Sequence, residues 1–515
     1  MAAASNPPAP QASTAAYSFA TSPARGDHDE YLQGLLLLRA GQAAAAAECL
    51  AAAVAAVPTH AGARVNLVRA WLAAGDPRRA LHAADAALAL LPDHAELLFS
   101  RGTALNQLAL PHAARETLTC ALALAPRHAP THLNLGNAYA DLDDLDAAEY
   151  YIRAALHLDP RLVEAHASLG FVLTSQGRLA EAIAACEAAI ELDPDFVQAH
   201  WNRATALLLA GDFARGFAAY EWRKRHPRFH ADFPVLPGPV WTGDDPAGRT
   251  ILVRAEQGLG DTIQLTRYLP LIAASGGTPV LACARPLLRL LASLPGVHAM
   301  PKDAPASRYD AWIDQMSLPL MFGTRPDTIL AAAGYLRADP ALVACWRARL
   351  PSGRKIGLAW AGNPAHGNDH RRSLPPRAVA QLVAACDAQP INLQVGPRSS
   401  EAGLPDLSAP LTDFAETAAL IANLDLVLTV DTAVAHAAGA LGVPCWVMLP
   451  FAPDWRWMLG RDDTPWYASL RLFRQPRPGD WDSVIEQIRT ALRRDAEPDR
   501  ESPDTPRTTH SAPAN

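Results

Sequence analysis

The sequence predicts an α-helical solenoid joined to an α/β module of two lobes, within a chain of 515 residues. Two observations lead to this prediction. Prolines recur at an interval of 34 residues in the first part of the chain: Pro58, Pro92, Pro126, Pro160 and Pro194. From Thr250 onward, short apolar runs alternate with segments of helix length, which is the pattern of parallel βαβ units.

Small residues follow the same interval and let two antiparallel helices pack closely in each repeat. Three rows of them are Ala46, Ala80, Ala114, Ala148, Ala182 and Gly216; Ala53, Ala87, Ala121, Ala155 and Ala189; and Gly34, Gly102, Gly136 and Gly170, broken by Val68. A fourth row holds Gly41, Gly75, Gly177 and Gly211, with Ala109 and Asp143 between them. We expect this fourth position to end the first helix in a left-handed turn, and the proline to end the second helix.

This helix pair resembles the tetratricopeptide repeat. The predicted full repeats span 27–60, 61–94, 95–128, 129–162 and 163–196, and a partial sixth runs from 197 to about 226. The resemblance implies that the solenoid holds a protein partner or an acceptor.

The sixth position of each repeat faces the concave side of such solenoids, and three repeats have asparagine there: Asn66, Asn134 and Asn202. Their amides could bond the backbone of an extended peptide. The alternative is that asparagine is simply common at this position of the repeat.

Residues 227–248 contain five prolines and predict an ordered, extended connector. We expect residues 1–26 and 496–515 to be disordered, because both segments are polar or rich in proline. The beginning of the chain lacks the pattern of a secretory signal, and no apolar run approaches the ~18 residues of a membrane helix.

The net charge of −7 argues against a nucleic-acid partner. The seven scattered cysteines form no CxxC pair, which indicates reduced thiols in a cytoplasmic protein.

The α/β module is predicted as two Rossmann-like lobes at 249–345 and 346–495. Its strands are expected at 250–255, 278–284, 355–361, 391–396, 425–430 and 444–449. Ligands of such folds bind at the carboxyl ends of the strands. The loop after the first strand lacks GxGxxG, so a dinucleotide-dependent oxidoreductase is a poor interpretation.

The loop after the first strand carries Gly258, Gly260 and Asp261, at the start of a predicted helix. Glycine permits close approach of a ligand or another backbone. Asp261 has two possible roles, a helix cap or a general base toward an acceptor hydroxyl in the cleft.

The loop after the strand at 355–361 carries Asn363, Arg371 and Arg372. An arginine pair beside a strand end suits a diphosphate, although solvated surface arginines are an equal alternative. The nearby His366, Asp369 and His370 lack the spacing of a metal site, and we expect no metal.

The most informative segment follows the strand at 425–430. Asp431 or Thr432 caps a short helix whose first turn, from Ala433 to His436, contains no acidic residue. The free N–H groups and the positive end of the helix dipole predict a phosphate site there, to which His436 could donate. The alternative is a structural turn with a histidine on the surface.

The pattern Asp-Thr-Ala-Val-Ala-His at 431–436 resembles the signature of the heptosyltransferase-like glycosyltransferases, which have the GT-B fold. Gly260 and Asp261 resemble the Gly-Asp motif of the same family. The order of repeats before a GT-B module is similar to that of the O-linked N-acetylglucosamine transferases and their bacterial relatives.

The resemblance implies inverting, metal-independent transfer of a sugar from a nucleotide-sugar to an acceptor hydroxyl, without a cofactor. It places Asp261 as the base, and Gly260, Asn363, Arg371, Arg372, Asp431, Thr432, Ala433 and His436 around the donor. The segment 449–457 departs from the family, which has a small Gly-Pro loop at this place. A transferase-like scaffold without activity is therefore the alternative.

Overall fold

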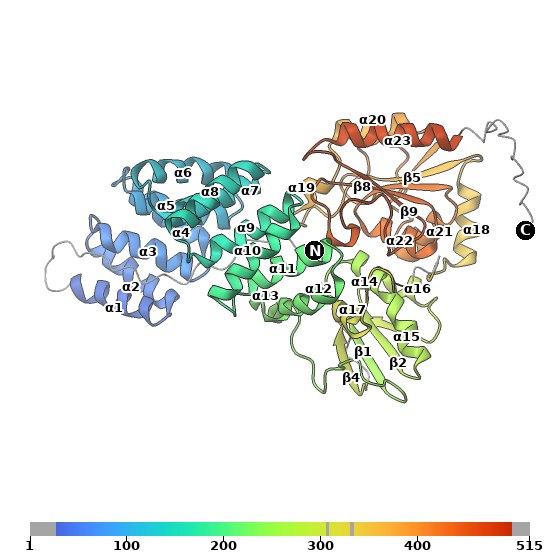
Figure 1. Cartoon of the computed structure of the whole chain (residues 1–515), viewed down its shortest axis with the longest axis horizontal. Helices are drawn as coiled ribbons and strands as arrows, with labels where there is room; N and C mark the ends of the chain where they lie inside the picture. The colour runs from blue at the N-terminus through green and yellow to red at the C-terminus, as the bar shows by residue number, and fades with distance from the viewer. Residues whose placement is uncertain (1–26, 305–307, 330–333, 497–515) are drawn as a thin grey trace, which may run out of the picture.

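The computed structural model describes residues 27–304, 308–329 and 334–496. A helical solenoid forms one half of an elongated molecule, and two α/β lobes form the other half (Figure 1). The predicted fold class is therefore confirmed. The segments 1–26 and 497–515, which the sequence predicts to be disordered, lie outside the described residues.

The solenoid is built from antiparallel helix pairs at the predicted spacing. Its helices are α1 (Asp27–Arg39), α2 (Ala43–Ala56), α3 (Ala61–Ala73), α4 (Pro77–Leu88), α5 (Ala95–Gln107), α6 (Pro111–Leu124), α7 (Ala129–Asp141), α8 (Leu145–Leu158), α9 (Val163–Ser175), α10 (Leu179–Leu192), α11 (Val197–Leu209) and α12 (Phe213–Tyr220). A 3-10 helix, η1 (Glu221–Arg225), and a short helix, α13 (Pro227–Asp232), lead out of it.

The turn inside every repeat is left-handed, as predicted. The glycines of this row have φ angles between 73° and 85°, and Ala109 and Asp143 adopt φ angles of 55° and 63°. The last two carry the steric cost of a Cβ atom in this conformation, about 1–2 kcal/mol per residue.

Each glycine of the third row faces a larger residue, 16 positions later in the second helix of the same repeat. A Cβ atom added to Gly34, Gly102, Gly136 or Gly170 would come within 3 Å of Leu50, Leu118, Ile152 and Cys186, respectively. In the second repeat the sizes are exchanged, because Val68 has Ala84 at that position. The larger Val68 in the glycine row is thus compensated by the smaller Ala84 in the facing helix, and the packing is kept.

The N-lobe contains a four-stranded parallel sheet with the order β3-β2-β1-β4. Its strands are β1 (Thr250–Arg254), β2 (Thr278–Cys283), β3 (His298–Pro301) and β4 (Ala311–Asp314). Its helices are α14 (Leu259–Leu265), η2 (Thr266–Tyr268), α15 (Leu269–Ala274), η3 (Arg285–Leu287), α16 (Leu288–Leu291), η4 (Gln315–Ser317) and α17 (Leu318–Met321).

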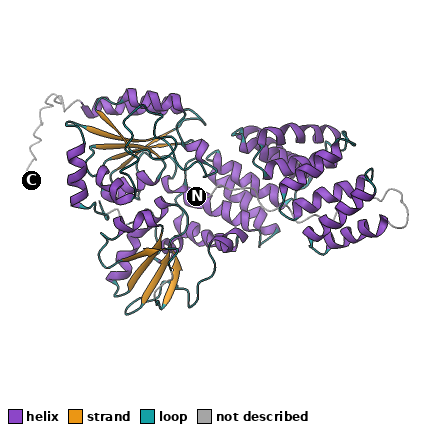
Figure 2. Ribbon diagram, turned by 180° about the vertical axis from the view of Figure 1, so that it is seen from behind, coloured by secondary structure: helices purple, strands orange, loops and turns teal. Residues whose placement is uncertain are grey.

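The C-lobe contains a five-stranded parallel sheet with the order β6-β5-β7-β8-β9. Its strands are β5 (Lys355–Ala359), β6 (Gln389–Asn392), β7 (Leu426–Val430), β8 (Cys445–Leu449) and β9 (Leu470–Arg474). Its helices are α18 (Pro340–Arg349), α19 (Asp369–Arg372), α20 (Pro376–Ala385), α21 (Phe414–Ile421), α22 (Ala433–Leu441), η5 (Trp455–Trp457) and α23 (Trp481–Ala496). Figure 2 shows the two sheets as separate layers with helices between them.

All six predicted strands exist, but the sequence analysis missed β3, β4 and β9. The strand predicted at 391–396 is displaced, because β6 ends at Asn392. The predicted boundary between the lobes falls inside α18, which packs on α21 of the C-lobe.

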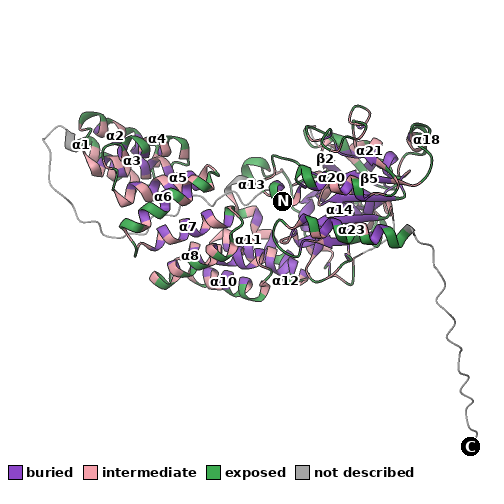
Figure 3. Cartoon of the chain, turned by 90° about the horizontal axis from the view of Figure 1, so that it is seen from above, coloured by how far each residue is buried: buried purple, intermediate pink, exposed green. Residues whose placement is uncertain are grey.

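One hydrophobic core extends through three parts of the molecule. It joins Phe213 and Phe217 of the solenoid to Ile263 of the N-lobe and to Trp455 and Trp466 of the C-lobe. Smaller separate clusters join neighbouring repeats along the rest of the solenoid. Buried residues accordingly dominate the two lobes and continue into α11 and α12, whereas the first repeats show mostly intermediate and exposed residues (Figure 3).

Candidate active site between the lobes

Asp261 lies in the first turn of α14, at the face of the N-lobe that meets the C-lobe. One carboxylate oxygen accepts a hydrogen bond of 2.7 Å from the backbone N–H of Gly258. The other forms an ion pair with Arg456 of the C-lobe. Both roles considered from the sequence are therefore compatible with its position, because the side chain caps its own helix and also faces the opposite lobe.

Arg456 is a buried cation at the centre of this contact. Its side chain is 3% exposed. Nε donates to Gln264 Oε1 at 2.6 Å, and Nη1 donates to Asp454 Oδ1 at 2.8 Å. Burial by itself raises the pKa of Asp261, but the Arg456 guanidinium together with weaker contributions, among them the Gly258 N–H, lowers the pKa to about 2. While this ion pair persists, Asp261 is a weak base, since a general base works best with a pKa near the operating pH.

The start of α22 lies directly against Gly260. The Thr432 hydroxyl caps the helix by accepting from the N–H of Val434 at 3.3 Å. A Cβ atom added to Gly260 would come within 3.3 Å of Ala433 Cα and still closer to the His436 ring. Only glycine permits this approach, which brings the two predicted motifs together across the lobes.

His436 is buried beneath this contact. Its Nδ1 lies 2.9 Å from the Tyr467 hydroxyl, and its ring stacks on Trp457 with 5.5 Å between the centroids. Burial, and then the charge of Arg456, lower the pKa of His436 to about 3, so the ring is neutral at neutral pH. The interpretation of His436 as a surface histidine is therefore wrong.

Asp431 adds a second carboxylate close to the start of the helix. Burial, and then the Asp454 carboxylate, raise its pKa, while Arg372 and Arg456 act in the opposite direction. Two carboxylates and two arginines therefore share this edge of the C-lobe sheet. An anionic ligand here would depend on the two arginines.

The two arginines of the loop after β5 have different surroundings. Arg372 interacts with Asp431 and forms an ion pair of 3.3 Å with Asp369. Arg371 points to the solenoid, where its Nη2 donates to the carbonyl of Ala140 at 2.8 Å and its Nε lies 2.6 Å from a carboxylate oxygen of Asp143. The prediction that Arg371 lies at the donor site is thus wrong, because its charge is used to join the C-lobe to the fourth repeat.

The remaining residues predicted in this loop have local roles. Asn363 Oδ1 accepts from the N–H of Ala365 at 3.0 Å, which shapes the turn. His366 accepts from the N–H of Asn368, and His370 contacts Gly367 and Asp143. Over the ranges that the structure describes, no group of three or more His, Cys, Asp and Glu side chains could hold a metal ion.

The asparagines predicted to line the solenoid groove bond within the solenoid. The Asn66 amide donates to Gly62 O at 2.8 Å, that of Asn134 to Thr103 Oγ1 at 2.7 Å, and that of Asn202 to Ala167 O at 2.9 Å. Asn134 and Asn202 thereby connect neighbouring repeats. Each of these amides therefore has at least one N–H engaged within the solenoid, and a ladder for a peptide backbone stays a prediction.

The sequence analysis missed Arg456, Trp457 and Tyr467, which surround Asp261 and His436. The only available signal was the departure of the segment 449–457 from the family pattern, with a buried arginine between two tryptophans. Its contact with Asp261 joins residues that are almost 200 positions apart.

Comparisons with known proteins agree with both halves of the fold. Models of the tetratricopeptide repeat match residues 31–77, 72–126, 129–162 and 172–211. The model of glycosyltransferase family 9 (heptosyltransferase) matches residues 402–446. The chain contains tetratricopeptide repeats and a segment of the glycosyltransferase family 9 type. That segment includes β7, the motif at 431–436 and all of α22.

One curated relative matches about half of the chain. Protein FlbA of Caulobacter vibrioides is 29% identical over 303 residues, which are 52% of this chain and 49% of FlbA. The chain therefore spans about half the length of this relative.

Two solved structures resemble the solenoid. TTC0263, a tetratricopeptide repeat protein of Thermus thermophilus, is 27% identical with a TM-score of 0.32, over 36% of this chain and 100% of that one. MamA of Desulfovibrio magneticus RS-1 is 23% identical with a TM-score of 0.30, over 33% and 96%. In the part of the chain with described coordinates, no helix is long and apolar enough to cross a membrane.

Proposed function

We propose that the α/β module transfers a sugar from a nucleotide-sugar to an acceptor hydroxyl, with inversion and without a metal. One observation carries the proposal. Asp261 of the N-lobe and the start of α22 in the C-lobe meet at the contact of Gly260 with Ala433 and His436. The match of residues 402–446 to glycosyltransferase family 9 supports the same assignment.

The two lobes have separate tasks in this mechanism. The N–H groups at the start of α22, together with Arg372, bind the diphosphate of the donor. The acceptor oxygen attacks the anomeric carbon and passes its proton to the Asp261 carboxylate. The bond between that carbon and the diphosphate oxygen breaks, and the electron pair leaves with the diphosphate. Preorganised donors that face this developing charge stabilise the transition state.

Arg456 connects donor binding to the base. The donor diphosphate is a stronger anionic partner for the guanidinium than one carboxylate. When Arg456 moves to the diphosphate, Asp261 loses the charge that lowers its pKa, while its burial continues to raise it. Asp261 then becomes a stronger base only after the donor has bound. The solenoid in turn recruits the acceptor or a protein partner.

The first test is the substitution Asp261→Asn. Thermal shift with a panel of nucleotide-sugars identifies the donor, and mass spectrometry measures the transferred mass on candidate acceptors. Transfer should fall by about 10²- to 10⁴-fold, the usual contribution of a general base, while donor binding persists. Asp303→Asn is the matched control, because this aspartate is exposed and pairs with the equally exposed Arg285. Unchanged turnover of the Asp261 variant would remove it from the mechanism.

The second test concerns the donor side. Arg372→Ala should weaken donor binding in calorimetry, whereas Arg377→Ala, a substitution of an exposed arginine on α20, should not. Equal donor affinity of both variants would exclude Arg372 from the site.

A transferase-like scaffold without activity is the second candidate. It is favoured by the ion pair between Arg456 and Asp261 and by the packing of Trp457 on His436, which occupy the contact between the lobes. Absence of a thermal shift with every nucleotide-sugar, in the native protein and in Arg456→Met, would support the scaffold.

A further inference from the structure

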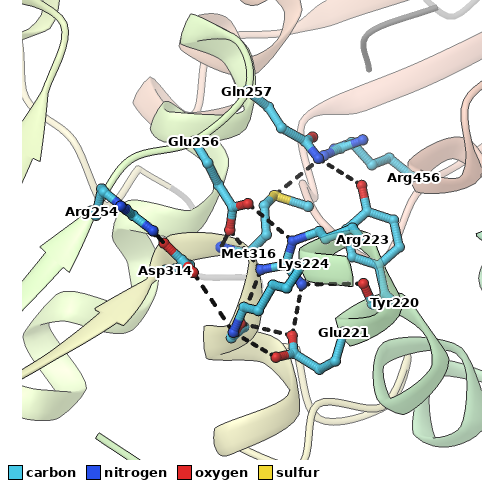
Figure 4. A network of polar contacts seen from close by, with 11 residues as sticks. Tyr220, Glu221, Arg223, Lys224, Arg254, Glu256, Gln257, Asp314, Met316 and Arg456 are labelled. Carbon is cyan, nitrogen blue, oxygen red and sulfur yellow. Dashed lines mark hydrogen bonds and ion pairs between the residues drawn. The ribbon is translucent and has the colours of Figure 1, made fainter. Parts of the chain in front are cut away.

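The loop between β1 and α14 is held by residues at the end of the solenoid. Glu256 forms two hydrogen bonds with Arg223, from Nε at 3.0 Å and from Nη2 at 2.6 Å, and both residues are buried. The next residue, Gln257, donates from Nε2 to the Tyr220 hydroxyl at 2.7 Å. Figure 4 shows these contacts side by side. Two consecutive residues of the loop are thus fixed by the solenoid.

The backbone of Gln257 requires such support. Its φ angle is 65°, in the left-handed region, which is sterically unfavourable for a residue with a Cβ atom. Strained residues persist only where their surroundings hold them. Gly258 follows, and its N–H is the group that the Asp261 carboxylate accepts from. The position of Asp261 therefore depends on the conformation of Gln257.

The same part of the solenoid also supports Arg456. The Trp455 ring packs edge-on against Phe217, with 5.6 Å between the centroids, and lies 6.4 Å from the Tyr220 ring. The Arg456 guanidinium lies over Trp455, 4.3 Å from its centroid. Tyr220 therefore contacts both Gln257, which precedes the turn of Asp261, and Trp455, on which Arg456 lies.

We infer that Tyr220, the last residue of α12, is a positioning residue of the candidate active site. It fixes Gln257 in the loop that presents Asp261, and it packs behind the tryptophan that carries Arg456. The sixth repeat therefore belongs structurally to the site between the lobes. The catalytic meaning of this inference rests on the proposed function, but the mechanical coupling does not.

The coupling is measured by amide hydrogen exchange in the full chain. Tyr220→Phe removes one hydroxyl and keeps the ring. Exchange in a peptide covering 255–262 should become about fivefold faster, the effect of losing one hydrogen bond of about 1 kcal/mol. Gln257→Ala should give the same acceleration, and the double variant should add nothing. Tyr150→Phe, at a tyrosine that is 68% exposed, is the control without effect.

Two results would overturn the inference. The first is unchanged exchange at 255–262 in Tyr220→Phe. The second is an additive effect in the double variant. Tyr220→Phe could accelerate exchange throughout the sixth repeat by destabilising it. In that case Gln257→Ala decides whether the coupling exists, because this substitution leaves the solenoid intact. The coupling then requires that Gln257→Ala alone accelerates exchange at 255–262.

A kinetic measurement then separates positioning from general stability. With a donor identified by thermal shift, Tyr220→Phe should lower kcat about fivefold and leave the Kd of the donor unchanged, since the donor binds to the C-lobe. A changed Kd with an unchanged kcat would contradict the positioning role. If no nucleotide-sugar is used at all, the proposed function fails, and the exchange experiment still decides the coupling.

Discussion

Repeats one to five and repeat six share one helix-pair geometry but have different neighbours. In four of the first five, a glycine in the first helix meets a larger aliphatic or sulfur-containing residue in the second, as in Gly136 and Ile152, and the second repeat has the reverse pair, Val68 and Ala84. In the sixth, the corresponding positions hold Ala204 and Tyr220, and Phe213 and Phe217 join the core of the lobes. The period therefore defines the backbone, while side-chain size determines what the repeat packs against.

The ion pairs differ in the same way. Those of the earlier repeats lie on the surface, as between Arg178 and Glu181. The pair of Arg223 and Glu256 is buried and connects the end of the solenoid to the N-lobe. An exposed pair is screened by water, whereas a buried pair leaves a costly charge when one partner is removed.

The largest effect is expected at this buried pair. Glu256→Gln should lower the free energy of unfolding by about 3 kcal/mol, because the buried Arg223 charge loses its buried partner and keeps only Glu221, which is 26% exposed, as a counter-ion. Urea denaturation followed by tryptophan fluorescence measures it. Glu181→Gln, on the surface of repeat five, should leave the denaturation midpoint unchanged. Equal losses of stability in both variants would contradict the difference between the buried and the surface ion pair.

A pH dependence is expected from His436 in the shared interface. Its pKa in the folded protein is about 3, below the ordinary 6.5, so the unfolded chain takes up a proton first as the pH falls. The resulting stabilisation is complete above pH 6.5 and is lost progressively toward pH 3. At pH 5 the loss amounts to about 2 kcal/mol. Denaturation midpoints measured from pH 8 to pH 4 should fall less steeply in His436→Gln, whereas His157→Gln, at an exposed histidine, should follow the native curve.

The volume matching within the repeats gives a smaller effect. Gly170→Val inserts a side chain where Cys186 lies, and overpacking of this kind costs about 1–3 kcal/mol. Cys186→Ala in the same chain should restore most of the stability, because it recreates the pair of Val68 and Ala84. Thermal denaturation of the two single variants and the double variant tests this. A double variant whose loss of stability equals the sum of the two single losses would contradict the proposed size complementarity of positions 170 and 186.

The smallest effect is a gain in stability. Ala109→Gly should stabilise the third repeat by about 0.5–1 kcal/mol, because glycine adopts a positive φ angle without the steric cost that alanine bears. Ala113→Gly, inside α6, should instead destabilise by about 1 kcal/mol. The melting temperatures of the two variants should shift in opposite directions, and a shift of both in the same direction would contradict the assignment.

The sequence was sufficient for local features and insufficient for contacts between distant segments. The repeat interval predicted every helix pair and even the left-handed turns at Ala109 and Asp143. The strands β3 and β4, which have only four residues each, were missed, and β6, of the same length, was displaced, because runs this short give no clear pattern. The motifs around Asp261 and His436 were found because glycine and helix-start residues carry a local signal. The roles of Arg371 and Arg456 were not found, because each depends on a partner in another domain.

The contact of Arg371 with Asp143 and Ala140 has a mechanical consequence. The solenoid contacts the C-lobe at its fourth repeat, and its sixth repeat contacts both the N-lobe and the C-lobe. The end of the solenoid therefore bridges the two lobes. Any separation of the lobes must detach the sixth repeat from one of them, and a movement of the C-lobe away from it must also bend the repeats back to the fourth or break the contacts of Arg371, so a ligand that stiffens or curves this stretch of the solenoid would change how readily the lobes move apart.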